Sequence, residues 1–184
     1  MRFFMHVFSV FAVLTIAFLS ANSTTLADYD DPKKLSIEAA DGTPLASYTP
    51  EQLQAAFAQH EVETVIPWLK AEGAVSFRGP RLREVMAKHG LDNRDILAIA
   101  FDEYTANISV EDMDAYAPII ATEIGCREAD YKSGLCLKEE KFRPLRQEEN
   151  GYFRLIWPSA QLPKSSSEND PRWIWALVVL RPSS

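Results

Sequence analysis

Short apolar runs separated by turn-forming residues are the feature of this 184-residue chain that most constrains its fold. The clearest runs cover residues 96–101, 118–124 and 152–157. Each run has the length of a β-strand and is too short for a typical buried helix. Helix-start signals stand between several of the runs. The sequence therefore predicts an α+β domain with mixed β-sheets and a few short helices.

Three positions carry helix signals. Thr49 can cap a helix, Pro50 suits its first position, and Gln52 completes a capping box. A second helix is expected from residue 82 to its C-terminal stop at Gly90, and Ser109 is expected to cap a single helical turn. Strands are expected at residues 35–39, 62–66, 74–77, 96–101, 104–110, 118–124, 152–157 and 173–180. The charged stretch 137–150 has no periodicity and is predicted to be a solvated loop, and the adjacent Asp102 and Glu103 form a turn.

The first 27 residues have the composition of an export signal. Arg2 is the only charge before Asp28, and residues 3–19 are almost entirely apolar. Thr25-Leu26-Ala27 fits the small-x-Ala pattern, which predicts cleavage after Ala27 and a periplasmic protein. A retained membrane anchor is the alternative, although the run is short for a span and lacks a basic stop-transfer cluster. Residues 28–184 then form a single domain.

The net charge of the chain limits the classes of molecule that it is expected to bind. The net charge is −7, and removal of Arg2 with the signal leaves −8. No Lys/Arg cluster of the kind that binds nucleic acid occurs in the sequence. Nucleic acid and anionic membrane surfaces are therefore not expected as partners, whereas a cationic, neutral or aromatic small molecule remains open.

The two cysteines, Cys126 and Cys136, are separated by nine residues. In an oxidising compartment such a pair most simply forms a disulfide, which would stabilise the fold by roughly 2.5–3 kcal/mol. A redox-active pair and a metal site are the alternatives. The spacing is not that of a Cys-x-x-Cys motif, and only His60 and His89 lie outside the signal, so no metal site is expected.

The sequence shows no set of catalytic residues. Neither His60 nor His89 has a nucleophile motif beside it, and the glycines are too scattered for a phosphate-binding loop. Asp102 and Glu103 would point to opposite faces of an extended backbone, which makes them a poor acid/base pair. None of these residue patterns indicates an enzyme.

Several motifs follow one another in a distinctive order. Pro67-Trp68 closes a predicted strand, and residues 79–86 read Gly-Pro-Arg-Leu-Arg-Glu-Val-Met. Asp-Glu-Tyr at 102–104, Leu-Ile-Trp-Pro at 155–158 and Trp-Ile-Trp at 173–175 come later. Across residues 35–180 this order resembles the small secreted proteins that share the fold of the sulfite oxidase molybdopterin domain, especially the pterin-binding signalling members.

The resemblance has a consequence for the cofactor. In the enzymes of this family, a cysteine on the strand just before an equivalent tryptophan ligates molybdenum. Here that strand, residues 62–66, reads Val-Glu-Thr-Val-Ile and has no cysteine. The resemblance therefore implies that the protein binds a pterin and that molybdenum is not expected. The family's basic stretch before the Leu-Ile-Trp-Pro strand is replaced by residues 126–150, where Arg143 and Arg146 are candidates for its basic contact.

A pterin needs rings to stack on and groups that match its polar edge. Its amino and ring N–H donors suit a carboxylate, and its carbonyl oxygen suits an arginine. Aromatic and charged residues near predicted strand ends are therefore candidate ligand-binding residues: Trp68, Arg83, Asp102, Glu103, Tyr104, Arg154 and Trp157. The alternative is that each tryptophan belongs to the core and each charge to a solvated turn.

Three functions follow from these observations. The favoured one is a periplasmic pterin-binding module that, like the receptors it resembles, regulates a membrane partner that makes or degrades cyclic di-GMP. The loop between Cys126 and Cys136 is then a candidate docking surface. The second is a molybdopterin-dependent oxidoreductase that holds its metal by the cofactor dithiolene alone or by one of these cysteines. The third is a structural or interaction protein with a degenerate pocket.

Overall fold

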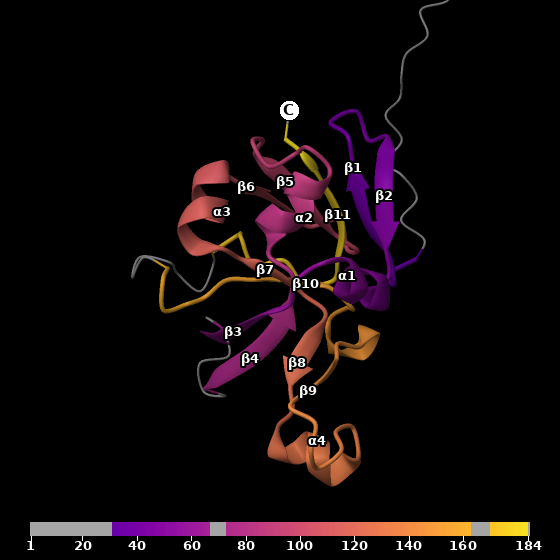
Figure 1. The fold of residues 1–184 in the computed structure, drawn as a ribbon, viewed down its shortest axis with the longest axis vertical. Helices are drawn as coiled ribbons and strands as arrows, with labels where there is room; N and C mark the ends of the chain where they lie inside the picture. Colours follow the sequence, from indigo (N-terminus) through magenta and orange to yellow (C-terminus); the bar gives the residue numbers. More distant parts are fainter. Residues whose placement is uncertain (1–30, 67–72, 163–169, 184) are drawn as a thin grey trace, which may run out of the picture.

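The computed structural model describes residues 31–66, 73–162 and 170–183. The expected signal segment and Trp68 therefore lie outside the described residues. Within these ranges the chain forms an α+β fold of short strands and short helices (Figure 1). No helix of the described ranges is long and apolar enough to cross a membrane.

The described residues form three sheets. The largest has the strand order β2-β1-β11-β5-β6, in which β1 and β11 are parallel and the other neighbours are antiparallel. Its strands are β1 (Leu35–Glu38), β2 (Pro44–Tyr48), β5 (Ile96–Ala100), β6 (Thr105–Ile108) and β11 (Leu177–Pro182). A four-stranded antiparallel sheet contains β3 (His60–Val65), β4 (Ala74–Gly79), β8 (Glu123–Gly125) and β9 (Phe142–Pro144). The third is the antiparallel pair β7 (Ile119–Ala121) and β10 (Arg154–Ile156).

The helices α1, α2 and α3 begin where the sequence predicts. At α1 (Pro50–Ala56) the capping box is present, because the Thr49 side chain accepts from the Gln52 N–H and the Gln52 side chain accepts from the Thr49 N–H. The second helix, α2 (Leu82–Lys88), buries Leu82, Val85 and Met86. Ser109 caps α3 (Val110–Tyr116), which is longer than the single turn predicted. A further helix, α4 (Glu128–Ser133), and a 3₁₀ turn, η2 (Gln147–Glu149), were not predicted.

One glycine allows two of the sheets to meet. A Cβ at Gly79, the last residue of β4, would collide with the backbone carbonyl of Ile120 in β7. Next to this contact the Ile120 N–H donates to the Pro80 carbonyl at 2.8 Å. Glycine is needed here because backbone meets backbone with no room for a side chain.

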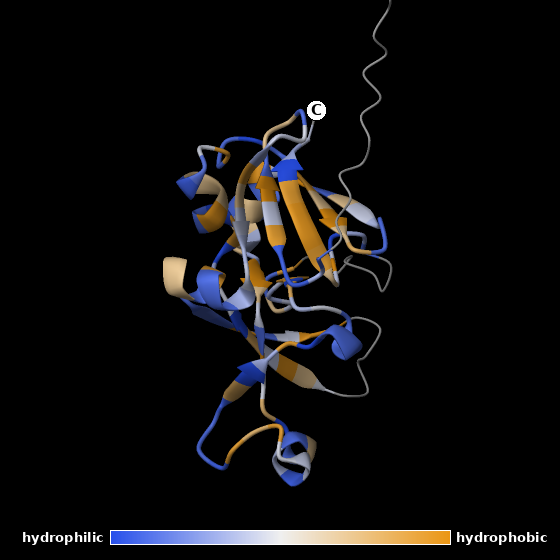
Figure 2. Cartoon of the chain, turned by 90° about the vertical axis from the view of Figure 1, so that its right-hand side faces the viewer, coloured by the Kyte–Doolittle hydropathy of each residue, from blue (hydrophilic) through white to orange (hydrophobic). Residues whose placement is uncertain are grey.

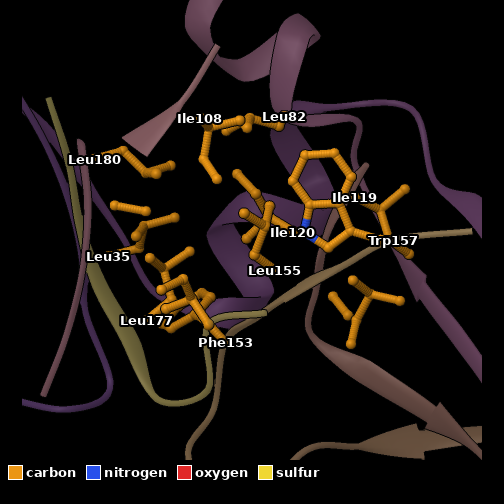
Figure 3. Packing of buried hydrophobic residues seen from close by; sticks show 14 of the residues in the cluster. Leu35, Leu82, Ile108, Ile119, Ile120, Phe153, Leu155, Trp157, Leu177 and Leu180 are labelled. Atoms are coloured by element: carbon orange, nitrogen blue, oxygen red, sulfur yellow. The ribbon is translucent and has the colours of Figure 1, made fainter. Parts of the chain in front are cut away.

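A continuous core lies between the sheets. Figure 3 shows Trp157 beside Ile119 and Ile120, with Phe153 and Leu177 further along the same cluster. Figure 2 shows apolar residues along the strands of the five-stranded sheet, while the outer turns are mostly hydrophilic and the helices carry both kinds of residue. The strands thus form this core together with buried residues of α1, α2 and α3.

Three predictions from the sequence are wrong in detail. The run 118–124 is not one strand: it breaks at Thr122 into β7 and β8, which belong to different sheets. The stretch 137–150 is not a solvated loop throughout, because it contains β9, η2 and the buried Arg143. The last strand begins at Leu177 rather than residue 173, since Ala176 has a φ of 47° and interrupts the extended backbone.

Cys126 and Cys136 are joined by a disulfide, as predicted. The loop that it closes contains α4, which lies at the end of the molecule beyond β8 and β9, away from the five-stranded sheet (Figure 1). The short helix is thus attached to the domain through two strands and a covalent cross-link.

Candidate functional site

Residues 170–176, here called the site segment, connect several of the predicted site residues. The Tyr104 hydroxyl donates to the Pro171 carbonyl at 3.1 Å. The indole Nε1 of Trp157 donates to the next carbonyl, that of Arg172, at 2.8 Å. The guanidinium of Arg154 lies over the ring of Trp175, 4.3 Å from its centroid. Residues that are far apart in the sequence therefore meet at one short segment.

Backbone hydrogen bonds hold the site segment in place. The Leu155 N–H donates to the Ile174 carbonyl at 2.9 Å, and the Phe101 N–H donates to the Ala176 carbonyl at 2.8 Å. The Ala176 N–H donates to the Asn150 carbonyl at 2.9 Å. Asn150 and Gly151 have φ values of 70° and 95°, and a Cβ at Gly151 would collide with Ala176. The backbones at this junction are thus packed without room to shift.

Arg172 anchors the segment to α3, and the sequence reasoning missed it. Its Nη1 pairs with Asp112 at 3.0 Å and its Nη2 with Asp170 at 2.7 Å. The hydrogen bond to Asp170 is the largest cause of the raised pKa of Arg172, so the group stays charged. Residues 158–171 look like an ordinary Ser/Pro-rich connection, and nothing local marks the arginine that follows them.

Trp157 lies in the core beneath the site segment. Its side chain is fully buried, the Arg172 guanidinium lies 5.1 Å from its ring centroid, and the Tyr116 ring packs edge-on at 6.4 Å. The Thr64 hydroxyl donates to the Trp157 carbonyl at 2.7 Å. Trp157 therefore packs as a core residue, which was the alternative to a ligand contact, and it supports the site segment from the core.

Arg154 is the most unusual residue of the site. It is 4% exposed, and besides Trp175 its guanidinium faces the ring of Phe77 at 5.8 Å. Within the described ranges its Nε is buried without a hydrogen-bond partner, and no carboxylate forms an ion pair with it. Burial lowers its pKa to about 10, an effect that the charge of Glu149 partly opposes. A buried guanidinium is normally paired, because leaving such a charge alone is costly.

The turn between β5 and β6 adjoins the site segment and carries three predicted residues. Phe101 and Tyr104 are 43% and 45% exposed, and Asp102 and Glu103 are exposed as well. The Asp102 side chain accepts from the Tyr104 N–H at 3.3 Å, and Glu103 has a φ of 67°, which non-glycine residues seldom adopt. Two rings and two carboxylates are thus presented on one four-residue turn.

The other predicted residues lie elsewhere. Arg83 pairs with Asp114 of α3 at 3.0 Å and contacts none of the site segment's residues in the described interactions. Trp68 lies outside the described residues. The two candidates for the family's basic contact are engaged by a carboxylate: Arg143 bonds Glu149 through both Nη atoms at 2.7 Å, and Arg146 reaches it at 3.3 Å. Arg143 and Arg146 are thus both held by Glu149, whereas no ion pair of Arg154 occurs among the interactions of the described residues.

Glu149 predicts a pH dependence of stability. Its burial alone would raise its pKa, but hydrogen bonds from Arg143 and Arg146 outweigh burial and the pKa is lowered. A lowered carboxyl pKa stabilises the fold above the unfolded value and loses this effect as the pH falls through the folded value. We expect the free energy of unfolding to decrease below about pH 4.3. Urea denaturation at a series of pH values would show a smaller decrease for Glu149→Gln than for the exposed control Glu139→Gln; equal slopes would contradict the assignment.

The donor set does not fit a cysteine-ligated molybdenum centre. Both cysteines form the disulfide at the α4 end of the molecule, so no free thiol is present to ligate the metal. At the expected ligand strand, β3 instead buries Thr64, whose hydroxyl is bonded to Trp157. Among the residues that the structure describes, no group of three or more His, Cys, Asp or Glu side chains could hold a metal ion.

Comparison with known proteins identifies the fold. No protein-family model matches the sequence, and no curated protein matches it. The structure is similar to the crystal structure of the sulfane dehydrogenase SoxCD from Paracoccus pantotrophus, with a TM-score of 0.54 and 14% sequence identity. The chain has a sulfite oxidase-like fold. The likeness covers 83% of this chain and 39% of that chain.

Proposed function

We propose that this protein is a non-catalytic binding module that takes a pterin at the site segment through Arg154. The observation that carries the proposal is the buried guanidinium of Arg154, whose Nε has no hydrogen-bond partner in the described part of the chain. A buried polar group of this kind calls for a partner, and a ligand oxygen is the simplest one. The sulfite oxidase-like fold supports the choice of a pterin-like ligand.

Groups on the turn between β5 and β6 suit the remaining chemistry of a pterin. The Arg154 guanidinium can donate to the carbonyl oxygen of the ring, and the carboxylates of Asp102 and Glu103 can accept from its amino and ring N–H groups. The exposed rings of Phe101 and Tyr104 offer apolar faces. Trp157 and Arg172 would act by holding the site segment rather than by touching the ligand.

A binding titration tests the proposal. We expect the purified protein to bind 7,8-dihydropterin saturably, with a dissociation constant below millimolar, followed by ligand fluorescence and calorimetry. Arg154→Met should weaken this binding strongly, whereas Arg94→Met, which removes an exposed arginine, should leave it unchanged. Absence of saturable binding by the unmodified protein would rule out the pterin ligand.

The likeness in fold to a dehydrogenase favours one second candidate, a molybdopterin-dependent oxidoreductase. It conflicts with the absence of a free cysteine among the described residues. Metal analysis of protein made in cells competent in cofactor synthesis separates the two functions. Stoichiometric molybdenum that disappears in Cys126→Ser would favour the oxidoreductase, and molybdenum-free protein that binds dihydropterin would favour the binding module.

The signalling part of the proposal is that the exported module regulates a membrane partner, such as an enzyme that makes or degrades cyclic di-GMP. The leader composition of residues 1–27 and the resemblance to pterin-binding signalling proteins support this role. Deletion of the protein should then change the cellular cyclic di-GMP level, and re-expression of Arg154→Met should fail to restore it. If Arg154→Met did restore the cyclic di-GMP level, signalling would not depend on ligand binding at Arg154.

A further inference from the structure

The disulfide-closed loop at the α4 end holds one buried carboxylate. The Asp130 side chain is 9% exposed and accepts from the Arg127 N–H at 2.8 Å, while its backbone carbonyl accepts from the N–H groups of Leu135 and Cys136. A helix of six residues has little stability of its own, so α4 depends on these bonds and on the cross-link. The disulfide thus fixes the position of the Asp130 carboxylate.

Asp130 in turn holds an arginine outside the loop. Its Oδ1 pairs with Nε of Arg143 at 2.9 Å, and both side chains are nearly inaccessible to solvent. The remaining guanidinium nitrogens of Arg143 bond both carboxylate oxygens of Glu149 at 2.7 Å. An ion-pair chain, buried at Asp130 and Arg143 and partly exposed at Glu149, therefore runs from the closed loop through β9 to η2.

The chain of contacts continues to the ligand arginine. Asn150 follows Glu149 directly, and its carbonyl accepts from the Ala176 N–H at 2.9 Å. The preceding residue, Trp175, carries the ring on which Arg154 stacks at 4.3 Å. Asn150 and Ala176 both have left-handed backbone conformations, which tolerate displacement poorly.

We propose that the Cys126–Cys136 disulfide is a redox-sensitive switch that sets the ligand affinity of the Arg154 site through this chain of contacts. A dithiol reductant would attack at Cys126, which is partly exposed, whereas Cys136 is buried. Two electrons and two protons convert the S–S bond into two thiols, and the reductant becomes its own disulfide. Asp130 then leaves Arg143, which remains buried with one carboxylate fewer, and the surroundings of Trp175 and Arg154 relax and admit water.

Because this step rests on the proposed function, its first test uses the same ligand. We expect 7,8-dihydropterin to bind the oxidised protein about tenfold more tightly than the protein reduced with dithiothreitol, within the usual range of coupling between sites. By reciprocity, saturating dihydropterin should lower the reduction potential of the disulfide by about 30 mV. Unchanged or tighter binding after reduction would overturn the switch.

Two variants in α4 separate the relay from a general effect of the disulfide. Asp130→Asn removes the negative charge that pairs with Arg143 while both cysteines remain, so the variant should bind dihydropterin weakly in both redox states. Glu128→Gln removes an exposed carboxylate whose partner is Lys132 and should retain the redox difference. Amide resonances of the five-stranded sheet should stay unchanged in both, which shows that the variants are folded. A redox difference that persists in Asp130→Asn would overturn the relay.

A measurement without ligand distinguishes failure of the switch from failure of the proposed function. The Nε–H resonance of Arg154, assigned by its loss in Arg154→Met, should shift when dithiothreitol reduces the unmodified protein and Glu128→Gln, and stay still in Asp130→Asn. If it shifts while dihydropterin binds neither redox form, the relay stands and the pterin proposal fails. If it does not shift in the unmodified protein, the relay fails whatever the titration shows.

Discussion

Trp157→Ala is expected to lower the free energy of unfolding by about 3–5 kcal/mol, as large-to-small changes of buried tryptophans do. The side chain is fully buried, packs against Ile119 and Ile120 in the central cluster (Figure 3), and its Nε1 bonds the carbonyl of Arg172. Removing the side chain leaves a cavity beneath the site segment and removes the hydrogen bond to the Arg172 carbonyl. Urea denaturation with an unchanged m-value would measure the loss.

Trp157→Phe provides the matched comparison. It keeps an aromatic ring but removes the indole N–H, so a smaller loss, about 1–3 kcal/mol, is expected. If Trp157→Ala cost less than about 1 kcal/mol, Trp157 would not be the core residue that the packing indicates. If the free energy of unfolding were unchanged but dihydropterin binding were lost, Trp157 would instead be a direct ligand contact.

Local signals in the sequence account for the elements that were predicted correctly. The capping box at Thr49 and the Ser109 cap act within four residues, and both are present in the structure. The apolar run that forms β5 is buried along most of its length, so its composition alone marks it as a strand. In such cases neighbouring residues contain all the information that the prediction needs.

The errors arise where the partner of a residue lies far away in the chain. Composition does not tell that Thr122 separates two strands of different sheets, because both halves of the run are buried. Arg143 is buried among carboxylates, an arrangement that hydrophobic periodicity cannot reveal. The charged stretch around it therefore looked solvated.

The candidate site shows the same limit. Tyr104 and Pro171 meet across 67 positions of sequence, and the contact between Trp157 and Arg172 depends on how the last loop returns to the sheet. The sequence showed aromatic and charged residues at predicted strand ends, but it did not show which of them lie close together in the fold. It named Arg154 as a ligand candidate without indicating that its guanidinium would be buried and unpaired among the described residues.

Because Arg154 is buried without an ion-pair partner among the described residues, Arg154→Met should stabilise the fold and at the same time weaken ligand binding. Arg154→Met is expected to raise the free energy of unfolding without ligand by about 1–3 kcal/mol, because replacing a buried charge by an apolar side chain of similar length removes its desolvation cost. Methionine can still pack on the rings of Trp175 and Phe77, which limits the loss of stacking. Dihydropterin binding should weaken by about 10–100-fold, the size of a lost charged hydrogen bond.

Arg143→Met is the matched control, since Arg143 is equally buried but paired. Removing it leaves Asp130 and Glu149 without their partner, so a loss of about 3–5 kcal/mol is expected instead of a gain. Thermal and urea unfolding of both variants, with and without dihydropterin, would compare the two arginines directly. A natural chain retains a destabilising buried charge when function requires it. If Arg154→Met instead destabilised the free protein as Arg143→Met does, stacking on Trp175 and Phe77 would be the reason for the arginine, and its assignment to a ligand would fail.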